Sequence, residues 1–96
     1  MQIEFIGVRT EGGWVVTSFR VGAVTCRAWA MVLGKWVIRA LSGKAPAAWG
    51  PGPIERRIYV GEIIKSLERD HGADWAPLFE EAKAHRAANP SKFPAP

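Results

Sequence analysis

The segment from Lys44 to Pro53 restricts the fold most, because it reads Lys-Ala-Pro-Ala-Ala-Trp-Gly-Pro-Gly-Pro. Each of its three prolines lacks a backbone donor, and its two glycines add conformational freedom, so no helix or strand can continue through it. We therefore predict a loop that separates two differently folded parts of the chain. Trp49 is an unusual residue for such a loop, and it either covers the core or stays exposed as an anchor for a partner.

Two segments before this loop have the composition of β-strands. Gln2 to Arg9 is rich in isoleucine, phenylalanine and valine, and Trp14 to Val21 alternates between a more apolar and a more polar side. The residues between them, Thr10-Glu11-Gly12-Gly13, have the length and the glycine content of a hairpin connection. This pattern predicts an N-terminal antiparallel β-hairpin.

The segment from Thr25 to Gly43 has a period that favours a helix over a further strand. Thr25 is a suitable N-cap, and Gly43 is a suitable residue to end the helix. The apolar residues recur at intervals of three and four, at Trp29, Val32, Leu33, Trp36, Val37, Ala40 and Leu41. The opposite side has positions four apart occupied by Arg27, Met31, Lys35 and Arg39. We predict an amphipathic helix with a basic outer stripe.

Two more helices are predicted after the loop. Ile54 to His71 has an apolar stripe and is followed by Gly72, although Gly61 weakens the helical pattern by about 1 kcal/mol. The alternative makes Ile54 to Val60 a third strand. Asp74 then caps a helix that ends near Asn89-Pro90.

Together these segments predict an α+β fold in which an N-terminal β-hairpin is followed by three helices packed on it. Ninety-six residues suffice for one hydrophobic core, so we expect a single compact α+β domain over residues 1–89. Residues 90–96 form a proline-rich C-terminal tail. The chain is 48% hydrophobic and 23% charged, which is typical of a small soluble globular domain.

The sequence also bears on where the protein acts. The most apolar stretch, Val21 to Leu41, is interrupted by Arg27, Lys35 and Arg39, so it does not predict a membrane span. No targeting signal is recognisable between Met1 and Arg9. A single cysteine, Cys26, gives no internal disulfide and makes the reducing cytoplasm the expected location.

The net charge of +4 is unevenly distributed along the chain. Residues 1–52 contain six basic and two acidic side chains, whereas residues 53–96 contain seven of each. The whole surplus therefore belongs to the first half. A localised positive charge of this kind is typical of a surface that meets an acidic protein or a phosphate backbone.

Catalytic and metal-binding patterns are weak. Cys26 at a helix start would have a favoured thiolate, but no histidine lies near it in sequence, and a buried structural cysteine is the simpler interpretation. His71 and His85, fourteen residues apart, match no metal-ligand spacing. The segment Gly50-Pro51-Gly52-Pro53 lacks the backbone donors of a phosphate loop. We predict no enzyme, no cofactor and no metal.

The leading hypothesis is a small non-catalytic binding protein of the inhibitor or adaptor type, in keeping with proteins that mobile elements encode. It would engage an acidic macromolecular surface through the basic helix face, and the expected partner is a protein. Direct nucleic-acid binding is the alternative, and the oligomeric state, a homodimer included, stays open. The predicted binding residues are Arg27, Lys35, Arg39, Arg20, Lys44 and Trp49.

Overall fold

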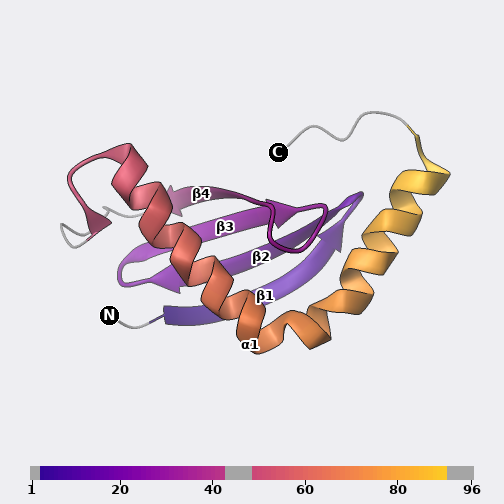
Figure 1. Cartoon of the computed structure of the whole chain (residues 1–96), viewed down its shortest axis with the longest axis horizontal. Coiled ribbons are helices and arrows are strands. Elements are labelled where there is room, and N and C mark those ends of the chain that lie inside the picture. Colours follow the sequence, from indigo (N-terminus) through magenta and orange to yellow (C-terminus); the bar gives the residue numbers. More distant parts are fainter. Residues whose placement is uncertain (1–2, 43–48, 91–96) are drawn as a thin grey trace.

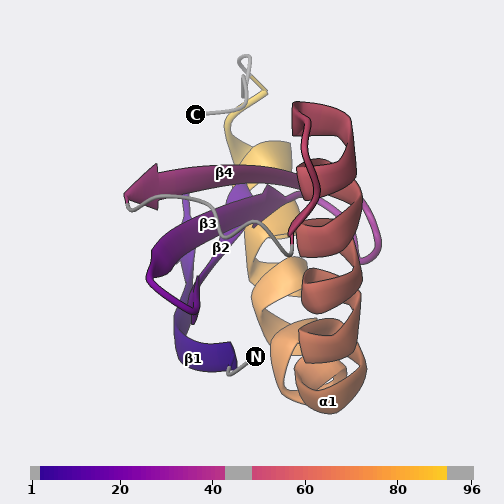
Figure 2. The ribbon, with the colours of Figure 1, turned by 90° about the vertical axis from the view of Figure 1, so that its left-hand side faces the viewer.

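A four-stranded antiparallel sheet is followed by one long helix in the computed structural model, which describes residues 3–42 and 49–90. The strands are β1 (Ile3–Glu11), β2 (Trp14–Val21), β3 (Val24–Ala30) and β4 (Trp36–Ser42), and they neighbour one another in chain order. The helix α1 spans Pro53–Ala88. It lies on one side of the sheet, so that the two form separate layers (Figure 1, Figure 2).

The predicted hairpin is confirmed and forms β1 and β2. Its turn is Gly12-Gly13, where Gly12 has a φ of 61° that favours glycine. A second tight turn follows at once, because Gly22 has a φ of 60° and leads the chain back into β3. β1 carries a register shift between Phe5 and Gly7, which marks a bulge on this edge strand.

The predicted helix from Thr25 to Gly43 is wrong, because β3 and β4 form a second hairpin there. The apolar residues that suggested a helical period are mainly β-branched or aromatic, which are types that suit strands. Gly34, with a φ of 85°, belongs to the turn between the strands, and a turn inside the segment is incompatible with one helix. Each strand has apolar residues at alternate positions, and the turn between β3 and β4 shifts one alternation relative to the other. Across the turn, the apolar residues therefore recur at intervals of three and four, as they would in a helix.

The described residues therefore form one α-helix in place of the three that the sequence predicted. Residues 54–60 belong to this helix and not to a third strand, and Pro53 occupies its first turn, where a missing N–H costs nothing. Gly72 does not end the helix. Pro77 lies inside it and cannot donate to the carbonyl of Ala73, which accounts for the bend midway along α1 (Figure 1).

The core lies between the sheet and α1. Glu68, in the middle of the helix, accepts hydrogen bonds from the backbone N–H of Gly34 and the indole of Trp36. Near the end of the helix, the Arg86 guanidinium donates to the carbonyl of Gly13. Both halves of α1 are thereby attached to turns of the sheet. The buried helix residues are Val60, Ile63, Ile64, Leu67, Trp75, Phe79 and Ala82.

Candidate binding site on the uncovered sheet face

Because side chains alternate along a strand, the register of the sheet assigns each residue to one of two faces. Val15, Thr17, Phe19 and Val21 of β2 lie on the face that packs against α1, which we call the covered face. The remaining residues lie on the opposite side, where no described helix or strand packs (Figure 2). We call this side the uncovered face. Its central residues are Val16, Arg27, Trp29, Val37 and Arg39.

Two arginines are direct neighbours on the uncovered face. Arg27 of β3 pairs with Arg39 of β4, two residues along each strand from the pair of Trp29 with Val37. The Cζ atoms of Arg27 and Arg39 lie 5.8 Å and 5.9 Å from the centroid of the Trp29 ring, within range of a cation–π interaction. Like charges directly opposite each other on neighbouring strands destabilise a sheet. This pair is therefore costly to the free domain.

Neither of these two arginines has an acidic partner in the described part of the chain, where the ion pairs involve other cations. Arg9 meets Glu11 at 3.2 Å, and Arg20 meets Glu4 at 3.5 Å. The exposed arginines of β1 and β2 are thus neutralised by neighbours on the same face. The positive charge of the uncovered face is concentrated at Arg27 and Arg39.

Two donors in this cluster are buried and find no acceptor among residues 3–42 and 49–90. They are Nε of Arg27 and Nε1 of Trp29, and Trp29 as a whole is 5% exposed. A buried donor that lacks an acceptor costs about 1–3 kcal/mol. Guanidinium and indole N–H groups can only donate, so an oxygen with negative charge is the ligand that this cluster is equipped to accept.

The predicted binding residues divide into three groups. Arg27, Arg39 and Arg20 lie on the uncovered face, although on strands rather than on a helix. Lys35 is exposed in the turn between β3 and β4, while Lys44 lies outside the described residues. Trp49 is 3% exposed and stacks on Tyr59 at 5.6 Å between ring centroids. It therefore covers the core and offers no exposed anchor.

Trp29 is the residue of this site that the sequence prediction missed, because it was assigned to an apolar helix face. The signal that could have placed it is the alternation through Val24, Cys26 and Ala28, which are fully buried, with more polar residues between them. That period of two predicts a strand with Trp29 on the other side.

The other chemically active residues lie elsewhere. Cys26 is fully buried on the covered face, and burial raises the pKa of its thiol from 9.0 to about 11. A reactive thiol requires the opposite shift. His71 stacks on Phe5 at 4.7 Å between ring centroids, within the packing around Trp75. In residues 3–42 and 49–90, no group of three His, Cys, Asp or Glu side chains could hold a metal ion.

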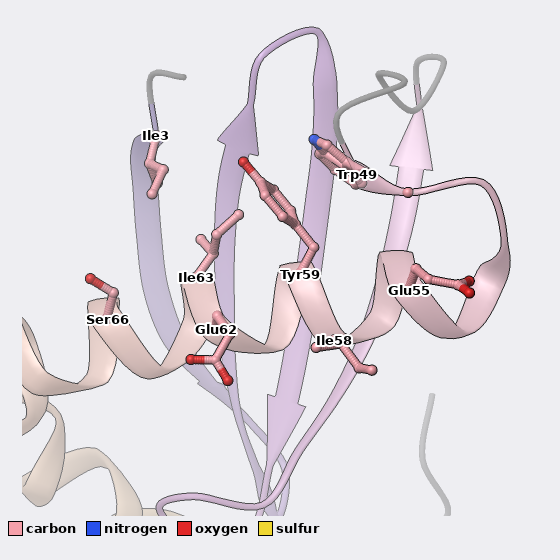
Figure 3. A pocket seen from close by; sticks show the side chains of 9 residues that line it. Ile3, Trp49, Glu55, Ile58, Tyr59, Glu62, Ile63 and Ser66 are labelled. Atoms are coloured by element: carbon pink, nitrogen blue, oxygen red, sulfur yellow. The ribbon is translucent and has the colours of Figure 1, made fainter.

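A second feature of the surface is an apolar groove of about 540 Å³ beside the first half of α1. Tyr59 and Ile63 project from α1 on the side of Trp49, whereas Ile58 and Glu62 project from the other side (Figure 3). Among the described residues that line it, the polar side chains are those of Glu55, Tyr59, Glu62 and Ser66, and the others are apolar or glycine. The groove therefore provides mainly shape and apolar surface.

Comparisons with known proteins return no family model, no curated protein and no solved structure that matches the chain. The described helix is too polar to cross a lipid bilayer.

Proposed function

We propose that this protein is a non-catalytic binding module that engages an acidic surface of a partner protein through its uncovered sheet face. The observation that carries the proposal is the pair of Arg27 and Arg39, which lie directly opposite each other and have no described carboxylate partner. Such a pair is unfavourable in isolation and becomes favourable when a carboxylate lies between the two guanidinium groups. Trp29 lies beneath them and positions both guanidinium groups through cation–π contacts, and arginine is enriched among the residues that dominate interface energetics.

An acidic protein accounts for this face better than a nucleic acid does. Proteins that grip single strands stack bases on exposed aromatic rings, whereas Trp29 is 5% exposed. Duplex recognition generally uses many phosphate contacts, and Arg9 and Arg20 are already paired with glutamates. Two unpaired arginines suit a localised cluster of carboxylates. A domain of this kind would act by occupying its partner, as inhibitors and adaptors do, and its single reduced cysteine is compatible with the cytoplasm.

The experiment compares two charge reversals of equal size. One protein carries Arg27→Glu and Arg39→Glu, and the control carries Arg56→Glu and Arg57→Glu, which are exposed positions on α1. Each protein is immobilised and exposed to a nuclease-treated lysate of the native host, and the retained proteins are quantified by mass spectrometry. We expect the sheet variant to lose at least about tenfold of the partner that wild type and control retain, since hot-spot residues contribute about 2 kcal/mol or more.

Circular dichroism and thermal unfolding establish that both variants fold. Equal retention of the partner by the two variants would contradict the proposal. If wild type retains proteins from an untreated lysate but not from the nuclease-treated one, and its binding to single-stranded DNA falls steeply with salt, the partner is a nucleic acid and the protein-partner proposal is wrong.

A further inference from the structure

The two edges of the sheet differ in how they are protected. β1 carries the bulge between Phe5 and Gly7, and its exposed charged residues include Glu4 and Arg9. Thr10 at its end also donates a hydrogen bond of 3.3 Å to Glu81 of α1. Bulges, charges and covering elements are the means by which proteins prevent unwanted pairing at sheet edges.

β4 also has a register shift, but it lies near the end of the strand, opposite Thr25 and Cys26. From Cys26–Ala40 to Ala30–Trp36 the pairing with β3 is regular, and β4 follows β3 as the last strand in the sheet order (Figure 1). The only charged residue of β4 is Arg39. Alternate backbone N–H and C=O groups along an edge strand have no partner within the sheet. The part of β4 from Trp36 to Ala40 therefore offers a regular template for one more strand.

The side chains of β4 specify what that strand should be. On the uncovered face, Val37 is 38% exposed and Arg39 is exposed beside Arg27. On the covered face, Trp36 and Ile38 are only partly buried by the core. Every second residue of an added strand would thus lie on the uncovered face, next to a positive and partly apolar surface. The residues between them would lie on the covered face, next to an apolar surface.

Charge argues against a second copy of this chain as the added strand. Two β4 strands could pair antiparallel about a two-fold axis. If that axis passed within one residue of Arg39, the two Arg39 residues would be directly opposite or diagonal neighbours. Cβ atoms in those positions are about 5–8 Å apart, close enough for long side chains to interact. Two further Arg27 side chains would lie on the same face. Like-charge repulsion therefore disfavours this homodimer.

We infer that an extended acidic segment of a partner protein pairs with the edge of β4 and continues the sheet. This inference rests on the proposed function and specifies how the acidic partner binds. Backbone hydrogen bonds along β4 supply much of the affinity, as in other cases of strand addition. Acidic residues at alternate positions meet Arg39 and the adjacent Arg27, and apolar residues between them contact Ile38 and Trp36.

A defined peptide tests this mode of binding. The probe is an acetylated and amidated hexapeptide of alternating valine and glutamate, and the control replaces glutamate with lysine. Both are titrated into the uniformly ¹⁵N-labelled protein at neutral pH. We expect the glutamate peptide to shift the amide signals of β4 and to slow their hydrogen exchange on the order of tenfold at saturation, while the amides of β1 are unaffected. The lysine peptide is expected to do neither.

Backbone methylation of the peptide separates strand pairing from simple charge attraction. N–H groups of successive residues in a strand point to opposite edges. Methylating the valine amides in one peptide and the glutamate amides in another should therefore abolish binding in one case only. Equal binding by both methylated peptides would overturn the inference.

Reversing the charge of Arg39, on the edge strand β4, gives a protein variant that matches the charge reversal in the peptides. Arg39→Glu should weaken the glutamate peptide roughly tenfold and allow the lysine peptide to bind in its place. If the glutamate peptide shifts the side-chain signals of Arg27 and Arg39 without protecting β4 amides, the acidic face is correct and strand addition is wrong. If it affects neither the arginines nor β4, the proposed function fails as well.

Discussion

The two faces of the sheet are built from the same strands, yet they bury their residues by different means. On the covered face of β3, Cys26, Ala28 and Ala30 are small and fully buried, because α1 supplies the large residues that cover them. On the uncovered face, Trp29 is almost as deeply buried, but arginines of the sheet lie over it. Long cationic side chains can cover apolar surface with their methylene groups while the charge stays in water.

This difference separates stability from recognition. Atoms of the covered face are held between two layers and cannot leave without unfolding the domain. The arginines above Trp29 are attached to one layer only, so they can change rotamer when an acidic group arrives. We therefore expect mutations on the covered face to change the free energy of unfolding, and charge mutations on the uncovered face to change binding.

Truncation of Phe19 should give the largest effect on stability. Phe19 is fully buried on the covered face and pairs with Phe5 in β1 and Cys26 in β3. Phe19→Ala should lower the free energy of unfolding by about 3–5 kcal/mol, which combines lost burial with the cavity left behind. Urea titration measures this change.

Val37→Ala is the comparison for the uncovered face, because Val37 is 38% exposed. We expect a loss of less than about 1 kcal/mol, since little apolar area is removed from a half-exposed site. If Phe19→Ala and Val37→Ala lost equal free energy of unfolding, the two faces would not differ in their contribution to stability.

The same comparison explains which parts of the fold could be predicted. The first hairpin was recognisable because Gly12-Gly13 separates two strand-like segments. β3 and β4 were harder to recognise, because the alternation through Val24, Cys26 and Ala28 is short, Ala28 and Ala30 have low strand propensity, and Trp29 is an apolar residue on the other face. Interaction with neighbouring strands, which a local pattern does not contain, decided the structure.

The spacing of the apolar residues in the sequence could have predicted the single helix. Val60, Ile64, Leu67, Trp75 and Phe79 continue one stripe at intervals of three, four or eight residues, past both Gly72 and Pro77. A proline within a helix bends it without ending it when tertiary contacts hold both halves. Here Glu68 and Arg86 provide such contacts on either side of the bend.

The predicted binding residues stay a prediction, while the helix on which they were grouped is wrong. Arg27 and Arg39 were placed together as members of a helical stripe, and the register of β3 with β4 places them together as cross-strand neighbours. Arg20 lies on the same face but is neutralised by Glu4. Trp49 could not be assigned, because a loop sequence does not reveal whether an aromatic ring finds a partner such as Tyr59.

Ionisation of Cys26, on the covered face, should change the free energy of unfolding by an intermediate amount. The pKa of the thiol is about 11 in the folded protein, against 9.0 as its ordinary value. Between these two pH values the unfolded state loses its proton while the folded state keeps it, so the free energy of unfolding must fall as pH rises from 9 to 11. Urea titrations at pH 8 and pH 10.5 measure this loss.

Cys26→Ala supplies the control, because it removes the thiol and leaves every other titrating group in place. The loss between pH 8 and pH 10.5 should be smaller in this variant than in wild type. Alkylation by iodoacetamide should likewise be slow in native wild type and fast in urea, since the thiol is fully buried. Identical pH dependence in the two proteins would show that Cys26 does not differ between folded and unfolded states.

On the covered face, the smallest expected effect is a gain in stability at Thr17. Thr17 is fully buried on the covered face, and its Oγ1 has no hydrogen-bond partner in the described residues. Thr17→Val keeps the branched shape and removes the hydroxyl, so it should raise the free energy of unfolding by about 1 kcal/mol, because a buried polar group without a partner is unfavourable. Ser18→Ala is the control on the neighbouring position, which faces the other way and is only partly buried, and it should change stability by less than about 0.5 kcal/mol. A loss of stability in Thr17→Val would mean that the hydroxyl is satisfied within the core, and that the covered face tolerates polar groups as the uncovered face does.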